Sequence, residues 1–200
     1  ISISFGGGAR QGFCDQLLTY FNPIKYARDR NVLVVIAAGN DGQRGVTDPG
    51  CISLATTVGA TWQDSIQSFS GRGVAVDIVA PSTAGTSSAT PVVSGTVALI
   101  KYVHPEYNAE QVEEALFKTA KDLGAPGKDN DYGWGRVDAF AAVNYVSTSP
   151  LINSISPDTL QASSPGFTLT VNGANFVQGS IVRWNNQNKQ TNFVNSNQLT

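Results

Sequence analysis

The stretch from Gly85 to Gly95 places hydroxyl groups at the start of a predicted apolar helix. We expect this helix to open at Ser87 and to run to about Val103, with Pro91 in its first turn, where a missing N–H costs least. The free backbone N–H groups and the positive dipole end of a helix N-terminus stabilise negative charge that develops there. A serine held there could act as a nucleophile. On physics alone, an ordinary N-cap is the simpler interpretation.

The same stretch also contains a long pattern of small and hydroxyl residues, formed by Gly85, Thr86, Ser87, Ala89, Pro91, Val93 and Gly95. This pattern resembles the nucleophile signature of the subtilisin-like serine proteases, the peptidase S8 subtilase family. The resemblance implies a serine endopeptidase that hydrolyses peptide bonds through an acyl-enzyme on Ser87, with polypeptides as its substrates.

A second polar group, Asn40, follows an apolar run over residues 32–38 that predicts a parallel strand buried on both faces. Ligands collect at the carboxyl ends of such strands, although residues 39–42 could also form a simple turn. Residues 37–40 resemble the subtilisin segment that contains the oxyanion asparagine. The resemblance implies that the Asn40 amide and the Ser87 backbone N–H hold the tetrahedral oxyanion.

The resemblance also implies that two short segments bind substrate, and for each a plain core strand is the alternative. The first matches the end of the family's substrate-pairing strand, to which an extended peptide adds through main-chain hydrogen bonds. The second matches the wall of the pocket for the residue before the scissile bond, where small side chains would leave room. The candidates are Ser4, Phe5 and Gly6 in the first segment, and Ala37, Ala38 and Gly39 in the second.

The sequence departs from the family pattern in the rest of the catalytic triad. The family orders its triad as Asp, His and Ser, whereas the one histidine here, His104, follows Ser87 along the same predicted helix. At about 1.5 Å per helical residue, His104 would lie roughly 25 Å from Ser87, too far to be its base. A serine without a base is a weak nucleophile. We therefore expect these residues alone to be nearly inactive, and the Asp and His to lie upstream in the parent chain.

A second departure lies between Pro81 and Gly85, where only residues 82–84 replace a hairpin that is long in many relatives. This shortening could reshape the floor of the pocket, or it could mark a degenerate relative. A second function class therefore stays open beside the endopeptidase. It is a non-catalytic cell-surface or adhesion protein built on a decayed subtilase fold.

Cys14 and Cys51 are the two cysteines of the chain, too few for a zinc site, and His104 does not complete one. Cysteines at similar places are paired in extracellular subtilisin-like proteases. The resemblance therefore implies a disulfide, an oxidising compartment and a secreted or cell-surface protein. Two free buried thiols in a cytosolic protein are the alternative.

Composition and charge limit the partners that we expect. The formal net charge is −2 with no cluster of Lys and Arg, which argues against binding to nucleic acid or to an anionic membrane surface. The longest apolar run, residues 32–38, is too short for membrane insertion. Asp129 and Asp131 lack a full calcium-ligand spacing, so we expect a solvated loop there and no identifiable cofactor, with a structural calcium ion as the unsupported alternative. The sequence gives no indication of the oligomeric state.

Strands and helices alternate through the first part of the chain, which predicts an α/β layer structure around a parallel sheet. We assign residues 1–147 to the C-terminal part of a subtilisin-like catalytic domain. Beyond them the chain is rich in Asn, Gln, Ser and Thr, and alternating runs predict antiparallel strands at 167–171 and 181–184, with a turn at 172–173.

The residues from 148 onward also show a resemblance, which rests on Pro150–Pro157 and Gly173–Phe176. These segments are similar to the opening half of an IPT/TIG immunoglobulin-like domain. We therefore expect residues 148–200 to form the N-terminal half of such a truncated β-domain, with edges that are exposed or poorly paired.

Overall fold

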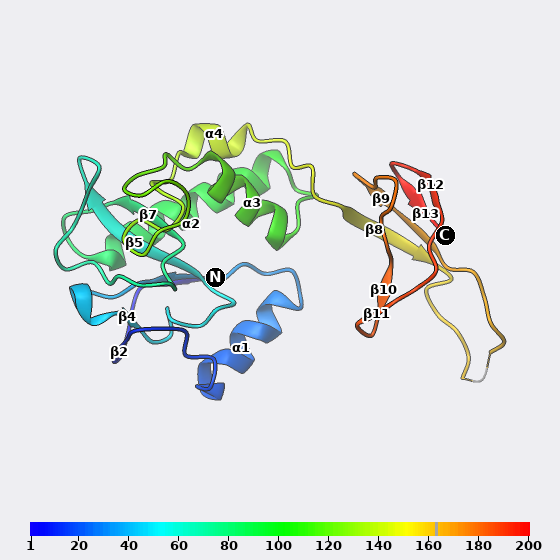
Figure 1. Cartoon of the computed structure of the whole chain (residues 1–200), viewed down its shortest axis with the longest axis horizontal. Helices are drawn as coiled ribbons and strands as arrows, with labels where there is room; N and C mark the ends of the chain where they lie inside the picture. Colours follow the sequence, from blue (N-terminus) through cyan, green and yellow to red (C-terminus); the bar gives the residue numbers. More distant parts are fainter. Residues whose placement is uncertain (163) are drawn as a thin grey trace. The chain divides into compact units, whose positions relative to one another are not determined.

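Short parallel strands form a sheet in the first part of the chain (Figure 1). The strands are β1 (Ser2–Ile3), β3 (Val35–Ala37), β5 (Thr56–Trp62), β6 (Ser65–Ile66) and β7 (Ile78–Pro81). In this computed structural model, which describes residues 1–162 and 164–200, β3 lies between β1 and β5, and β5 also pairs in parallel with β7. The short β6 pairs with the end of β5 in antiparallel fashion. The predicted α/β fold with a parallel sheet is confirmed.

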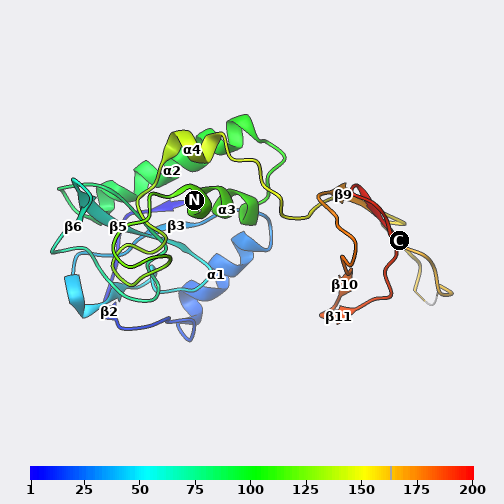
Figure 2. The same cartoon turned by 45° about the horizontal axis from the view of Figure 1, so that its top comes forward.

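Helices cover both faces of this sheet (Figure 2). They are α1 (Leu18–Arg28), α2 (Thr86–Val103), α3 (Ala109–Thr119) and α4 (Ala139–Val143). Successive side chains of a strand point to opposite faces. Leu33 and Val35 therefore pack with residues of α2, α3 and α4, whereas Val34 and Ile36 pack with residues of α1. This double coverage explains why the strand is apolar on both faces.

Helix α2 is buried on one face only. Ala89, Val93 and Ile100 are inaccessible and lie in the core cluster against the sheet. Leu99 and Tyr102 face solvent, and Tyr102 is 86% exposed. The apolar composition predicts a helix that is buried around most of its circumference. Within the described residues, the sheet, α3 and α4 contact it from one side, so the opposite face stays open.

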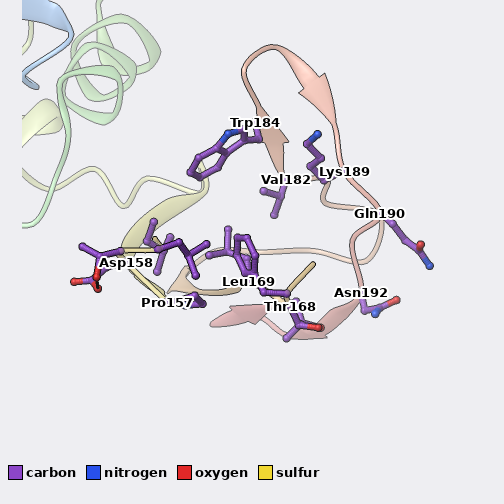
Figure 3. Close-up of a pocket in the computed structure, with 14 residues that line it drawn as sticks. Pro157, Asp158, Thr168, Leu169, Val182, Trp184, Lys189, Gln190 and Asn192 are labelled. Carbon is purple, nitrogen blue, oxygen red and sulfur yellow. Dashed lines mark hydrogen bonds between the residues drawn. The ribbon is translucent and has the colours of Figure 1, made fainter. Parts of the chain in front are cut away.

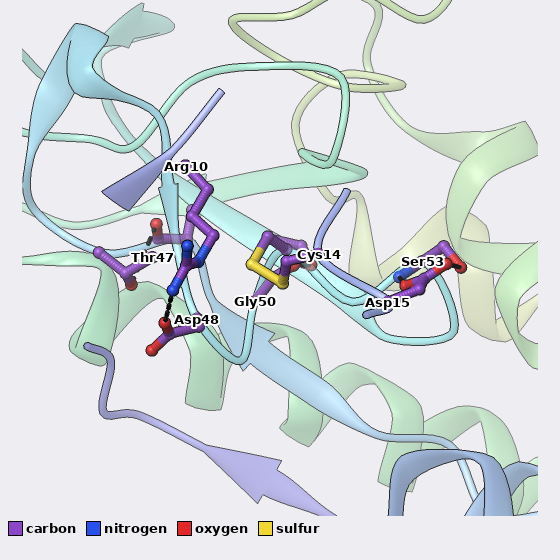
Figure 4. Close-up of a disulfide and its surroundings, with 10 residues drawn as sticks. Arg10, Cys14, Asp15, Thr47, Asp48, Gly50 and Ser53 are labelled. Carbon is purple, nitrogen blue, oxygen red and sulfur yellow. Dashed lines mark hydrogen bonds and ion pairs between the residues drawn. A yellow bond between two sulfur atoms is a disulfide. The ribbon is translucent and has the colours of Figure 1, made fainter. Parts of the chain in front are cut away.

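An antiparallel strand pair and a disulfide fasten the chain on either side of β3. The pair is β2 (Ala9–Arg10) with β4 (Val46–Thr47), and the 3-10 helix η1 (Gly42–Arg44) precedes β4. Cys14 and Cys51 form the predicted disulfide, with a Cα–Cα distance of 5.4 Å (Figure 4). Both cysteines are fully buried, and Cys14 N–H donates to Cys51 O at 3.0 Å. The segment before α1 is therefore tied to the segment before β5.

Replacing both Cys14 and Cys51 by alanine should lower the free energy of unfolding by about 4 kcal/mol. The disulfide joins residues 37 positions apart, so its removal frees a long loop in the unfolded chain. Thermal denaturation of the protein with and without a reductant measures this loss. The reductant should lower the midpoint of the wild type and leave that of the double variant unchanged. Equal midpoints for oxidised wild type and double variant would contradict the prediction.

The residues that follow form a second compact unit, since contacts divide the chain into Ile1–Ser147 and Thr148–Thr200. Antiparallel strands in the order β12-β13-β9-β8 make up its main sheet, and β10 and β11 form a hairpin. The strands are β8 (Leu151–Ser156), β9 (Thr170–Ala174), β10 (Arg183–Trp184), β11 (Gln187–Asn188), β12 (Phe193–Asn195) and β13 (Gln198–Leu199). The predicted antiparallel β-structure is confirmed.

One detail of this unit differs from the prediction. Asn172 and Gly173 lie inside β9 and do not form a turn. A Cβ atom at position 173 would lie 1.8 Å from Leu151 O, so glycine is required for β8 to approach this closely. The Asn-Gly pair is therefore explained by strand packing, a long-range contact that the local sequence does not reveal.

The second unit encloses an open hollow of about 900 Å³ (Figure 3). Apolar side chains such as Leu169, Val182 and Trp184 line it, while the carboxamides of Gln190 and Asn192 point away from its centre. Polar and charged residues such as Asp158, Lys189 and Thr200 also border the hollow. The buried apolar cluster of this unit is Val171, Phe176 and Leu199.

Candidate active site

Ser87 lies in the first turn of α2 and is exposed to solvent. Its hydroxyl donates a hydrogen bond to Ser4 O at 2.9 Å. The loop before the helix is held by the buried Ser82, whose hydroxyl donates to Gly85 O at 2.8 Å. The structure therefore presents the Ser87 hydroxyl on a fixed helix end, next to the segment that follows β1.

Asn40 lies just beyond the carboxyl end of β3 and is also exposed. Its Oδ1 accepts hydrogen bonds from the backbone N–H of Thr86 at 2.9 Å and from the Thr86 hydroxyl at 3.2 Å. Because Oδ1 faces the helix, the two N–H donors on Nδ2 are free of that contact. The residue borders an open depression of about 390 Å³. Asn40 and Ser87 are thus brought together at one edge of the sheet.

Thr86 connects the strand to the helix, a role that sequence reasoning did not give it. Its side chain is fully buried, and its hydroxyl accepts a hydrogen bond from Gly39 N–H at 3.1 Å while donating to Asn40 Oδ1. The end of β3 and the start of α2 are therefore clamped through one hydroxyl. The sequence feature that could have drawn attention to Thr86 is its position between Gly85 and Ser87 in the motif.

The two expected substrate-binding segments differ in solvent exposure. Ser4, Phe5 and Gly6 are exposed, and the Phe5 side chain is 65% accessible. Ala37 and Ala38, in contrast, are buried. Gly39 is half-buried, so it is the residue of the second segment that reaches the surface.

His104 lies at the opposite end of α2 from Ser87. Its Nε2 is 3.1 Å from Val143 O, and its ring stacks on Tyr107 with centroids 4.4 Å apart. These contacts are structural, and they leave the Ser87 hydroxyl without a histidine base from this part of the chain.

The acidic residues of the later loops also serve structure. Asp129 Oδ1 accepts hydrogen bonds from the N–H groups of Asp131 and Tyr132, which shapes the loop. Burial raises the pKa of Asp77, against the opposing effects of Lys128 and of a hydrogen bond from Thr57 N–H. Among the described residues, no three His, Cys, Asp or Glu side chains are grouped so as to hold a metal ion. In the same residues, no helix is both long and apolar enough to cross a bilayer.

Comparison with known families identifies the first part of the chain. The sequence profile of the subtilase family matches residues 1–135. The chain belongs to the subtilase family. An IPT/TIG domain profile matches residues 150–200, so the subtilase region is followed by a second domain type.

Named relatives support the same family. The chain is 40% identical to subtilisin Savinase of Lederbergia lenta over 134 residues. The aligned region covers 60% of this chain and 49% of that protein. It is also 40% identical over 134 residues to an alkaline protease of Shouchella clausii, covering 60% of this chain and 34% of that protein. The chain thus spans half or less of the length of these relatives.

Solved structures of proteases share the fold over a larger part of this subtilase chain than the sequence alignments above cover. A lanthipeptide protease superposes with a TM-score of 0.62 at 26% identity, covering 71% of this chain and 60% of that structure. A protease of Pseudoalteromonas arctica superposes with a TM-score of 0.59 at 28% identity, covering 71% of this chain and 50% of that structure.

Proposed function

We propose that this chain is the nucleophile-bearing part of a subtilisin-like serine endopeptidase. Ser87 Oγ attacks the carbonyl carbon of a peptide bond and forms an acyl-enzyme, which water then hydrolyses. The observation that carries the proposal is the 2.9 Å hydrogen bond from Thr86 N–H to Asn40 Oδ1, which sets the Asn40 carboxamide beside Ser87.

In this proposal, the Nδ2 donors of Asn40 and the Ser87 backbone N–H stabilise the oxyanion of the tetrahedral intermediate. The position of Ser87 in the first turn of α2 supports this role, because N–H groups of a first helical turn lack intrahelical acceptors. An extended polypeptide pairs with the exposed residues Ser4–Gly6 and passes Gly39 on the other side.

The triad Asp and His are proposed to come from the parent protein outside residues 1–200. The base takes the Ser87 hydroxyl proton, which in this structure is donated to Ser4 O. His104 cannot do so from the far end of α2. Residues 1–200 alone are therefore proposed to be nearly inactive.

The protein is further proposed to act outside the cell or at its surface. The buried disulfide supports this location, because such bonds persist in oxidising compartments. Residues 1–147 are proposed as the catalytic part and 148–200 as the start of the IPT/TIG domain, supported by the division into two compact units.

A fluorophosphonate probe tests the nucleophile directly in the full-length protein. The probe should form a covalent adduct on Ser87, located by peptide mass spectrometry, because an activated serine attacks its phosphorus centre. The adjacent exposed Ser88 serves as an internal control and should stay unmodified. Absence of an adduct on Ser87 would overturn the proposal and favour a non-catalytic adhesion protein on a decayed protease fold.

A further inference from the structure

The segment that follows β1 has little stiffness of its own. Ser4 and Phe5 lead into three consecutive glycines, Gly6–Gly8. Glycine loses more conformational freedom on ordering than any other residue, so such a segment needs outside contacts to hold one conformation. The segment begins at the proposed nucleophile, since the Ser87 hydroxyl donates to Ser4 O at 2.9 Å. Its position beside Ser87 therefore depends on what fastens the glycines.

Asp48 fastens the glycines through both its main chain and its side chain. Its carbonyl oxygen accepts from Gly7 N–H at 2.7 Å, and its own N–H donates to Gly8 O at 3.2 Å. The carboxylate lies against Gly7, where an added Cβ atom would overlap Asp48 Oδ1. The same carboxylate pairs with Arg10, with 3.2 Å between Asp48 Oδ2 and Arg10 Nη2 (Figure 4). Asp48 thus holds the glycines and the residue that leads out of them.

The ion pair between Asp48 and Arg10 is shielded on its acidic side. The Asp48 side chain is 10% exposed and that of Arg10 is 41% exposed. Arg10 lies in β2, and the partner strand β4 ends at Thr47, directly before Asp48. Hydrogen bonds between charged groups are stronger than neutral ones, and more so where water is excluded. Removing either side chain should loosen the glycines while the β2–β4 pairing persists.

Resting on the function proposed above, we propose that Asp48, paired with Arg10, is a positioning residue for the substrate-pairing segment Ser4–Gly6. It acts through Gly7 and Gly8 and not on the reacting atoms. Because the glycines are held in one conformation before the polypeptide arrives, binding costs less ordering of the segment. Main-chain pairing is the same in the bound substrate and in the transition state, so this pre-ordering lowers KM and leaves kcat unchanged.

The test compares two substrates of the full-length protein. One is a tetrapeptide anilide, which reaches Ser4–Gly6, and the other is the N-acetyl ester of a single residue, which is too short to pair with that segment. Asp48→Ala should raise the KM for the tetrapeptide by roughly 5- to 10-fold, the size expected for lost pre-organisation. Its kcat, and both constants for the ester, should stay within about twofold of the wild type. A purely structural role would instead reduce the turnover of both substrates equally.

A double-mutant cycle tests whether Asp48 acts together with Arg10. Arg10→Ala should raise the KM for the tetrapeptide about as much as Asp48→Ala does, and the double variant should raise it no further, because all three remove one interaction. Arg10→Lys keeps the positive charge on a contact made through a single nitrogen, so its KM should stay near that of the wild type. If Asp48→Ala does not fold, judged by thermal denaturation, the exposed Arg10→Ala change decides.

Asp15→Ala is the matched control. Asp15 fastens the same two parts of the chain, since its carboxylate accepts from Ser53 N–H at 2.9 Å and from the Ser53 hydroxyl at 2.7 Å (Figure 4). Along the chain, the Cys14–Cys51 disulfide separates this contact from the glycines. Its loss should therefore leave the KM for both substrates unchanged.

Two results would overturn the role of Asp48. One is a folded Asp48→Ala or Arg10→Ala variant with the wild-type KM for the tetrapeptide, and the other is an equal loss of turnover on the tetrapeptide and the ester. Labelling by the fluorophosphonate probe separates this failure from that of the proposed function. A protein that labels on Ser87 but gives either result rejects only the role of Asp48, whereas a protein that does not label rejects both proposals.

Discussion

Replacing Ser87 by alanine should reduce the turnover of peptide substrates by the full-length protein on the order of 10⁶-fold, the scale measured when subtilisin loses its nucleophile. The Ser87 Oγ is the atom that forms the acyl-enzyme in the proposed mechanism, so the variant can bind substrate but has no group to acylate. The kcat on a peptide substrate measures this loss. Ser87 is exposed and its hydroxyl contacts Ser4 O, so the variant should fold normally.

The neighbouring Ser88→Ala variant is the matched control. Ser88 is exposed in the same turn of α2, and its backbone N–H donates to Gly85 O at 3.1 Å, a contact that alanine preserves. Its turnover should stay within about threefold of the wild type, as expected for a side chain that makes no transition-state contact. If Ser87→Ala retained wild-type turnover, the nucleophile would lie elsewhere and the proposed mechanism would be wrong.

The resemblance to the subtilase signatures singled out Asn40 and Ser87, since local rules alone favour a turn at residues 39–42 and an ordinary N-cap at Ser87. Local rules did predict the elements that position them. Asn40 follows an apolar strand and Ser87 opens an apolar helix, and both features appear in short stretches of the chain. Parallel strands all end at the same edge of the sheet, where the helix that follows also begins. The parallel α/β fold follows from the same pattern of buried strands and intervening helices.

Contacts between distant segments could not be predicted in the same way. The link from Thr86 to Gly39 N–H spans 47 positions, and Thr47 meets Gly6 from a separate strand. Periodicity says that these residues are buried or lie at turns, but not which distant atoms they touch. The same limit applies to Gly173, whose Asn-Gly context favours a turn while the approach of β8 places it in a strand.

Changing Asn40 to aspartate should separate the two functions of the carboxamide, which are anchoring of Thr86 by Oδ1 and the proposed stabilisation of the oxyanion by Nδ2. Aspartate keeps an oxygen that accepts from the Thr86 N–H and hydroxyl, but it loses the Nδ2 donors and adds a negative charge beside the developing oxyanion. The kcat should fall by roughly 100- to 1,000-fold, the magnitude established for this type of donor in subtilisin. The KM should change little, because the donor acts on the transition state and not on the bound peptide.

Comparison with the Asn40→Ala variant shows whether the loss of turnover comes from the missing donors or from a less stable fold. Alanine removes the acceptor as well, which leaves the N–H of the fully buried Thr86 without its partner, so unfolding free energy should fall by about 1–3 kcal/mol. Both variants should lose turnover to a similar degree, whereas only Asn40→Ala should lose thermal stability. Wild-type kcat in Asn40→Asp would remove Asn40 from the oxyanion hole and reduce its role to anchoring the start of α2. A loss of stability in both would show that the turnover change reflects a displaced helix.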